Sequence, residues 1–199
     1  MAIIMGGADT KFGYKVLKVQ PNSPAEGAGL LPYIDVVVGI NGATISESEM
    51  PLQEILRRNT NCLVTLTVWN TLKQEMRDVK VRLRNDWGGE GVLGAKMGFE
   101  EIDEAALKSF HVTEVALGSP AAEAGLIPAE DYILTAAEHV IGDAEELATL
   151  ALYSAELKLA VYNKVKQTVR EVVLKPNTTW GGSGALGCQI AEGLLHKIN

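Results

Sequence analysis

The sequence has few of the residues that most directly indicate redox chemistry or metal binding. It contains 2 cysteines, Cys62 and Cys188, which form no Cys-x-x-Cys pair. We therefore expect two reduced thiols and no disulfide framework. It contains 3 histidines, and no two of them share helical or strand spacing. We expect no metal centre and no cofactor, and we expect His111 to be an exposed strand residue.

The sequence also lacks a long apolar segment and an excess of positive charge. No run approaches the roughly 18 consecutive apolar residues of a membrane-spanning helix. The apolar start at residues 1–5 is too short for a secretory signal and has no basic flank. Residues 1–100 carry 11 Lys/Arg and 11 Asp/Glu, whereas residues 101–199 carry 7 and 14. An acidic second half argues against a nucleic acid as partner, because nucleic-acid binding needs a basic stripe.

One glycine-rich stretch is present twice, 93 residues apart. It is Trp-Gly-Gly-Glu-Gly-Val-Leu-Gly at residues 87–94 and Trp-Gly-Gly-Ser-Gly-Ala-Leu-Gly at residues 180–187. A second segment is duplicated as Asn-Ser-Pro-Ala-Glu-Gly-Ala-Gly-Leu at 22–30 and Gly-Ser-Pro-Ala-Ala-Glu-Ala-Gly-Leu at 118–126. The duplication predicts two domains of about 95 residues each, long enough for separate cores. We place the boundaries at 1–12 for an N-terminal tail, 13–103 for repeat 1 and 104–199 for repeat 2.

Hydrophobic periodicity predicts a small α+β module in each repeat. In repeat 1 it predicts strands at 13–19, 35–40, 62–70, 75–83 and 95–102, and helices at 24–28 and 50–59. In repeat 2 it predicts strands at 110–115, 157–163 and 168–174, a short helix in the duplicated Ser-Pro-Ala segment and a longer helix at 144–152. Ser23 and Asp143 are predicted N-caps.

The glycine-rich loops are suited to hold an anion, because glycine lets backbone N–H groups lie exposed in a tight turn. Residues 89–94 match the Gly-x-Gly-x-x-Gly fingerprint of dinucleotide sites. That fingerprint requires a following helix, whereas residues 95–102 alternate like a strand and only 12 residues follow Gly187. The anion that fits better is the terminal carboxylate of a peptide that adds a strand to the sheet edge. We expect Trp87 and Trp180 to cover the core beside these loops.

The candidate catalytic residues are better explained by structure. Ser23 or Ser119 could join His111 and Asp131 in a hydrolytic triad, but both serines stand at predicted helix N-caps and no nucleophile-elbow sequence is present. Asp35 and Asp131 occupy equivalent places in the two repeats. We expect them to fix a turn by hydrogen bonds to the backbone, so we predict no enzymatic activity.

The loop residues resemble the carboxylate-binding loop of PDZ modules. Val-Leu-Gly-Ala at 92–95 and Ala-Leu-Gly-Cys at 185–188 stand where such modules keep the pattern Φ-x-Gly-Φ. In ordinary PDZ order this loop comes early, whereas here it ends each repeat. The resemblance therefore implies two tandem, circularly permuted PDZ-like domains, each a five- to six-stranded, partly open barrel with two helices. Two such repeats resemble the GRASP family of Golgi reassembly stacking proteins, over about residues 13–198.

This resemblance implies a non-catalytic membrane-tethering scaffold. Family members self-associate in trans through the PDZ-like region, bind segments of coiled-coil golgins and lie at the cytoplasmic face of Golgi membranes. They are peripheral and anchored by N-myristoylation, which implies an acylated Gly6 if Met5 is the native first residue. A Ser/Pro-rich regulatory tail usually follows the second repeat, and we expect this chain to be a shortened form without it.

The resemblance also predicts the lining of two peptide grooves, drawn from the loop, the next strand and the longer helix. In repeat 1 the predicted residues are Leu93, Gly94, Ala95, Lys96, Met97, Leu52, Ile55 and Leu56. In repeat 2 they are Leu186, Gly187, Cys188, Gln189, Leu147, Leu150 and Ala151. The helical residues of repeat 1 could instead be plain core. We expect repeat 1 to mediate self-association.

Three further alternatives stay open at this point. The segment 194–198 could dock in a neighbour's groove or complete its own sheet, and we favour the second. The chain could be the regulatory PDZ pair of an HtrA-like protease, which would require a trypsin-like domain. It could also be a generic peptide-binding adaptor without self-association.

Overall fold

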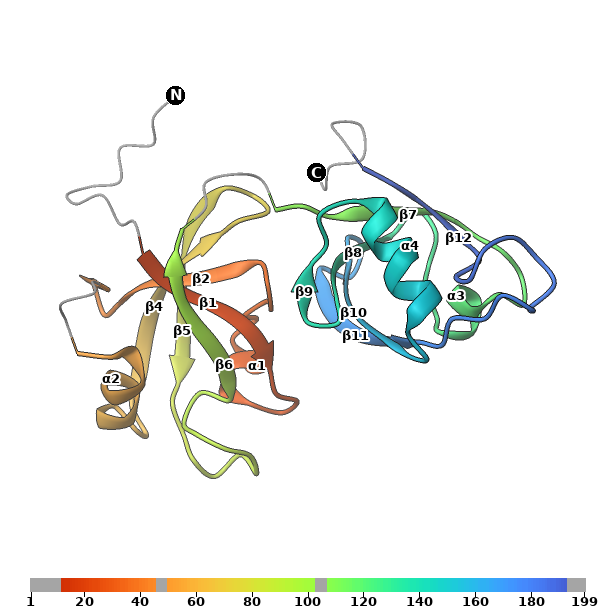
Figure 1. The fold of residues 1–199 in the computed structure, drawn as a ribbon. Helices are drawn as coiled ribbons and strands as arrows, with labels where there is room; N and C mark the ends of the chain where they lie inside the picture. The colour runs from red at the N-terminus through yellow and green to blue at the C-terminus, as the bar shows by residue number, and fades with distance from the viewer. Residues whose placement is uncertain (1–11, 46–49, 103–106, 193–199) are drawn as a thin grey trace. The chain divides into compact units, whose positions relative to one another are not determined.

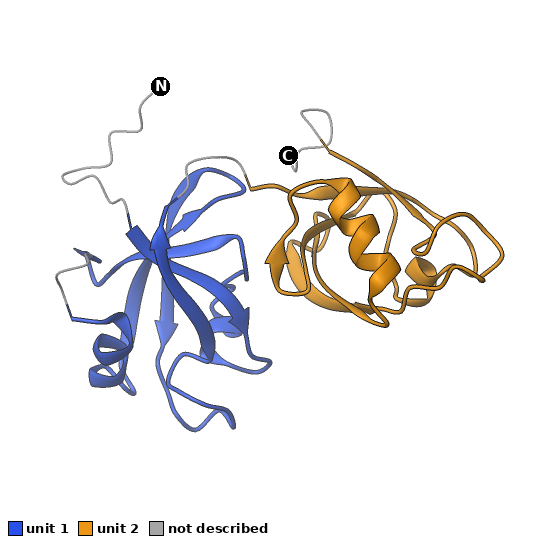
Figure 2. Cartoon of the chain, viewed as in Figure 1, with its two compact units in different colours: residues 1–106 blue, residues 107–199 orange. Residues whose placement is uncertain are grey.

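The computed structural model describes residues 12–45, 50–102 and 107–192. It divides into two compact units, residues 1–106 and residues 107–199, which Figure 2 shows in different colours. The two units contain the same elements in the same order (Figure 1). The duplication seen in the sequence is therefore a duplication of structure.

The described residues form six strands and two helices in each unit. Unit 1 contains β1 (Phe12–Val19), α1 (Pro24–Gly27), β2 (Asp35–Ile40), β3 (Ala43–Thr44), α2 (Leu52–Arg58), β4 (Leu63–Asn70), β5 (Glu75–Arg82) and β6 (Ala95–Glu101). Unit 2 contains β7 (Phe110–Val115), α3 (Pro120–Glu123), β8 (Asp131–Ala136), β9 (His139–Val140), α4 (Ala144–Tyr153), β10 (Leu157–Asn163), β11 (Thr168–Leu174) and β12 (Cys188–Ala191).

In each unit the first and last strands are neighbours in one antiparallel sheet. The strand order is β5-β4-β2-β1-β6 in unit 1 and β11-β10-β8-β7-β12 in unit 2, with β3 beside β2 and β9 beside β8. The pairing of β1 with β6 runs from Phe12 opposite Glu101 to Val19 opposite Ala95 (Figure 1). The strand that follows the glycine loop is thus an edge strand, although it is the last strand of its unit. This confirms the predicted permuted PDZ-like order.

The core of each unit lies between the sheet and the longer helix. In unit 1 it includes Val16, Val37, Leu52, Leu56, Leu66, Val79 and Leu93. In unit 2 it includes Phe110, Val112, Ile133, Leu147, Leu159 and Val172. These residues come from alternate positions of the strands and from one face of each helix, as the periodicities of 2 and 3.6 require.

The helix starts follow the predicted capping. Ser23 Oγ accepts a hydrogen bond from the N–H of Glu26 at 3.1 Å, and Asp143 Oδ1 accepts one from the N–H of Glu146 at 2.8 Å. The α2 helix differs from the prediction, because it begins at Leu52 after an extended Pro51 and has no side-chain cap. Residues 46–49, which precede this helix, lie outside the described residues.

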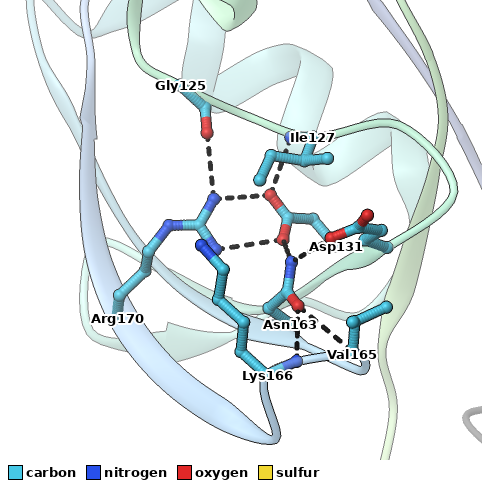
Figure 3. A network of polar contacts seen from close by, with 8 residues as sticks. Gly125, Ile127, Asp131, Asn163, Val165, Lys166 and Arg170 are labelled. Carbon is cyan, nitrogen blue, oxygen red and sulfur yellow. Dashed lines mark hydrogen bonds and ion pairs between the residues drawn. The ribbon is translucent and has the colours of Figure 1, made fainter.

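An ion pair with a buried carboxylate ties together three strands and a turn of unit 2 (Figure 3). Asp131 on β8 is fully buried, and Arg170 on β11 donates to both of its carboxylate oxygens, at 3.0 and 2.5 Å. Asn163 Nδ2 and the N–H of Ile127 also donate to this carboxylate, each at 2.8 Å. Arg170 Nη2 donates to the carbonyl of Gly125 at 3.0 Å as well. The predicted turn-fixing role of Asp131 is confirmed.

Unit 1 has the same network, but the buried carboxylate of Asp35 accepts fewer hydrogen bonds from its arginine. Arg77 donates to Asp35 through Nη2 alone, at 2.5 Å, while Asn70 Nδ2 and the N–H of Leu31 donate at 3.0 and 2.8 Å. Burial raises the pKa of Asp35 despite these bonds. In unit 2, burial also acts to raise the pKa of Asp131, but the hydrogen bonds from Arg170 and from Ile127 outweigh it and lower that pKa. Asp131 is therefore ionised at neutral pH.

Replacing Arg170 with methionine tests the importance of this network. We expect Arg170→Met to lower the free energy of unfolding of unit 2 by about 3 kcal/mol, because Asp131 is left buried without its cation. Urea unfolding followed by circular dichroism measures the loss, and hydrogen-exchange mass spectrometry assigns it to unit 2. Lys158→Met, at an exposed position of β10, is the matched control. Equal stability of the two variants would contradict the assignment.

Candidate peptide-binding site

The glycine loop of unit 1 is held in the fold by its carbonyl groups. The carbonyl of Leu93 accepts a hydrogen bond from the N–H of Ala25, and the carbonyl of Gly94 accepts one from the N–H of Gln20, both at 2.9 Å. The described peptide bonds are all trans, so each N–H points away from the carbonyl of the same peptide unit. The N–H groups of Gly94 and Ala95 are therefore directed away from the residues that anchor the loop. Such an arrangement forms a nest for an anion.

Unit 2 repeats this arrangement. The carbonyl of Leu186 accepts from the N–H of Ala121 and the carbonyl of Gly187 accepts from the N–H of Ala116, both at 2.9 Å. In both units the anchoring residues belong to the short capped helix and to the turn before it. The duplicated Ser-Pro-Ala segment thus positions the duplicated glycine loop.

The tryptophan of each loop packs on the glycines that follow it. Trp87 Nε1 donates to the carbonyl of Gly91 at 2.9 Å. A Cβ atom on Gly94, whose φ is +73°, would lie 2.8 Å from the Trp87 ring and 2.3 Å from Ser23 Cβ. A Cβ atom on Gly89 would lie 2.1 Å from the same ring. These two glycines are thus required by the indole, whatever ligand the loop binds.

Unit 2 has the same contact, with Trp180 Nε1 donating to the carbonyl of Gly184 at 2.8 Å. Both tryptophans are half-buried and lie against their loops. We predicted that they cover the core, but neither belongs to a core cluster. That prediction was wrong. Each indole ring packs on the glycines of its own loop, where the absence of a Cβ atom leaves space for it.

The structure separates the predicted groove residues of unit 1 into two groups. Leu52, Leu56 and Leu93 are buried, with 1, 4 and 3% of their surface exposed. The half-buried side chains that pack against the edge of this core are Ile55, Val92, Ala95 and Met97. Lys96 is exposed. Of the two interpretations of the helical leucines, the structure therefore favours core for Leu52 and Leu56, and leaves Ile55 and Met97 at the surface of the site.

The same separation holds in unit 2. Leu147 and Ala151 are buried, and the half-buried residues beside them are Leu150, Leu186, Cys188 and Ile190. Ile190 was not among the predicted residues, although it stands 93 residues after Met97 and alternation along the strand could have indicated it. Gln189 is exposed, and Gly187 is half-buried.

The two cysteines differ in their surroundings. Cys188 takes the place of Ala95 directly after the loop, and burial raises the pKa of its thiol to about 11. It therefore stays protonated at neutral pH and is a poor nucleophile. Cys62 is exposed in the turn after α2, and both thiols are free.

The strands that follow the loops have an open edge. Within the described part of the chain, β6 pairs only with β1, and β12 pairs only with β7. The outer N–H and C=O groups of an edge strand can pair with a further strand. In unit 1 this edge begins at the glycine loop. Ala95 and Met97 on β6 pack against the same core as Ile55 of α2.

The other candidate residues have structural roles. Ser23 and Ser119 are buried N-caps, which removes them as nucleophiles. His111 is half-buried, and its ring stacks on Tyr132 with 4.5 Å between centroids. The expectation that His111 is exposed was wrong, because the partner ring comes from a neighbouring strand. The segments that contain Gly6 and residues 194–198 lie outside the described residues.

Comparison with known proteins identifies the family. The family model described as the GRASP55/65 PDZ-like domain matches residues 7–104 and again residues 96–199. The chain belongs to this family. It is 40% identical over 196 residues to Golgi reassembly-stacking protein 1 of Homo sapiens, covering 97% of this chain and 43% of that protein. The mouse protein of the same name is 40% identical over 189 residues, covering 94% and 42%.

A more distant relative matches over a similar length of this chain. An uncharacterized protein of Schizosaccharomyces pombe is 31% identical over 193 residues, covering 96% of this chain and 54% of that protein. The chain thus spans about half the length, or less, of these relatives. GRASP family proteins are non-catalytic. No helix within residues 12–45, 50–102 or 107–192 is long and apolar enough to cross a bilayer.

Two glycine substitutions in one loop test the packing of the indole. Gly91 and Gly94 both have positive φ, +72° and +73°, but a Cβ atom meets nothing within 4 Å at Gly91. We expect Gly91→Ala to cost about 1–2 kcal/mol from the backbone conformation alone. Gly94→Ala should cost clearly more, because the new Cβ meets Trp87 and Ser23. Urea unfolding measures both, and equal costs would contradict the packing argument.

Proposed function

We propose that this chain is a non-catalytic scaffold that tethers Golgi membranes and binds peptide segments at its PDZ-like units. The observation that carries the proposal is the open edge of β6, which begins at a loop whose N–H groups point away from the segment that anchors it. Similarity to proteins named for Golgi reassembly and stacking supports the cellular part of the proposal. The working modules are residues 13–103 and 104–199, after a tail of residues 1–12.

A bound peptide forms an additional antiparallel strand beside β6. Its terminal carboxylate accepts hydrogen bonds from the N–H groups of Gly94 and Ala95. Its last side chain packs against the half-buried Ile55 and Met97. In unit 2, Gly187, Cys188, Leu150 and Ile190 take the same places. Main-chain pairing supplies affinity that is independent of sequence, and the side-chain contacts supply selectivity.

Tethering follows when many such contacts act between two membranes. Unit 1 mediates self-association in trans, and golgin-type coiled-coil segments bind the remaining groove. A single contact of this kind is weak, but molecules held on a surface have a high effective concentration. The protein is held at the cytoplasmic face by a myristoyl group on Gly6 together with a partner, because one acyl chain alone binds only marginally.

A charge at Ile55 tests tethering by unit 1. We expect Ile55→Asp to abolish the clustering of beads coated with the protein, because a carboxylate is placed at the half-buried surface of the site. Gln53→Asp adds the same charge at an exposed position of α2 and should leave clustering unchanged. Circular dichroism confirms that both variants are folded. Clustering by Ile55→Asp would contradict the role of unit 1, and peptide binding without any clustering by the native chain would indicate an adaptor instead.

Acylation is tested on the protein made in cells. We expect mass spectrometry of its N-terminal peptide to show a chain that begins at Gly6 and carries one myristoyl group. Gly6→Ala should remove the lipid and release the protein from the membrane fraction, because the transferase requires an N-terminal glycine. An unmodified chain that begins at Met1 would refute the assignment.

A further inference from the structure

Two lysines lie opposite each other beside the candidate groove of unit 1. Lys18 on β1 and Lys96 on β6 are Cα partners in the antiparallel pair, and both side chains are exposed. None of the ion pairs in the described part of the chain includes either lysine. Like charges at directly opposite positions destabilise a sheet. An anionic group placed near them would relieve this repulsion.

Both lysines point to the face of the sheet opposite the core. Ala95 and Met97 flank Lys96 and pack against the core, so the alternation of a strand directs Lys96 to the other face. Val19, next to Lys18 on β1, also packs against the core. A β-bulge between Val16 and Lys18 sets this register. The pair therefore lies at the start of the open edge, on the side away from α2.

The neighbouring charges on this face leave the pair uncompensated. Glu100, four residues along β6, points to the same face as Lys96, but its carboxylate is 3.0 Å from the amino group of Lys15. Gly98 stands between them and is covered by Leu17, whose Cδ1 is 3.3 Å from the Cβ position of that glycine. Within the described residues, no carboxylate forms an ion pair with Lys18 or Lys96, so both amino groups can pair with an anion of another molecule.

An added strand would bring alternate peptide side chains to this pair. The side chain of the last peptide residue faces Ile55 and Met97. Because side chains alternate along a strand, those of the first and third residues before it lie on the same side as Lys96. Directly opposite Cβ atoms in such a pair are about 5 Å apart and diagonal neighbours about 7–8 Å apart. The side chain of Lys96 reaches both peptide positions. Lys18 lies on β1, so β6 separates it from the peptide, but its side chain is long.

At the equivalent positions, unit 2 has one negative charge and no positive charge. Glu114 on β7 and Gln189 on β12 are Cα partners in the same register. Gln189 Nε2 donates to Glu114 Oε2 at 2.8 Å, so the amide is held by the carboxylate. The two units have the same kind of loop, tryptophan and apolar side chains. They differ in the charge beside the open strand edge.

We propose that the groove of unit 1 selects peptides with acidic side chains at the first and third positions before the C-terminal residue. Lys18 and Lys96 are the residues that determine this selectivity, and Glu114 disfavours the same peptides in unit 2. The proposal rests on the strand-addition function proposed above. The two units would then bind different peptides, and unit 1 would bind the acidic ones.

Labelled eight-residue peptides that end in valine test the proposal by fluorescence anisotropy. One peptide has Glu at both positions, a second has Gln there, and a third has Glu there but an amidated C-terminus. We expect the native chain to bind the Glu peptide more tightly than the Gln peptide, by about two- to fivefold per lysine. The preference should shrink as salt is raised, because both lysines are exposed.

Paired substitutions assign the preference to the two lysines. The double variant Lys18→Gln, Lys96→Gln should bind the Glu and Gln peptides equally. The double variant Lys73→Gln, Lys80→Gln removes the same charge from exposed positions in and before β5, at the far edge of the sheet, and should keep the preference.

The outcomes separate the selectivity from the function on which it rests. If the native chain binds the Glu and Gln peptides equally, and both more tightly than the amidated peptide, strand addition stands and the lysine proposal falls. If the preference persists after both lysines are replaced, the lysine proposal also falls. If no peptide with a free carboxylate binds, both proposals are refuted.

Discussion

Each unit depends on the attachment of its last strand to its first. The carbonyls of Leu93 and Gly94 bind the N–H groups of Ala25 and Gln20, so the end of the unit is fixed to the segment that follows β1. This attachment holds β6 beside β1 as an edge strand. It also uses the carbonyls of the loop and leaves its N–H groups directed elsewhere. In the permuted order, the same hydrogen bonds thus fix the end of the unit and place β6 at the edge of the sheet.

The periodicity of the sequence predicted most strands and helices, because alternation and amphipathic faces are local patterns. It did not predict the two-residue strands β3 and β9, which are too short for alternation to be detected. It could not separate Leu56 in the core from Ile55 at the site, since both are apolar residues on one side of a short helix. The stacking of His111 and the place of Trp87 depend on contacts between distant segments, which no local pattern contains.

The two units keep a common interior and differ at their surfaces. The Asp–Arg–Asn network is present in both, on equivalent strands. At the end of the longer helix, Arg57 and Arg58 both bind Glu54 at 2.8 Å in unit 1 and hold its pKa at about 2. At the end of α4, Leu152 and Tyr153 are exposed instead, by 63 and 86%. The two units therefore have the same backbone arrangement but different surface chemistry.

The register of β1 with β6 determines how unit 1 responds to tension. Phe12 and Glu101, where the chain enters and leaves the sheet of unit 1, are direct partners in an antiparallel pair. Tension applied between Phe12 and Glu101 would pull apart adjacent strand ends. The hydrogen bonds between β1 and β6 then break one after another. They would share the force only if it pulled the two strands in opposite directions along their length. Unit 1 thus yields at low force from its open end, while the glycine loop at the other end is the last part to be loaded.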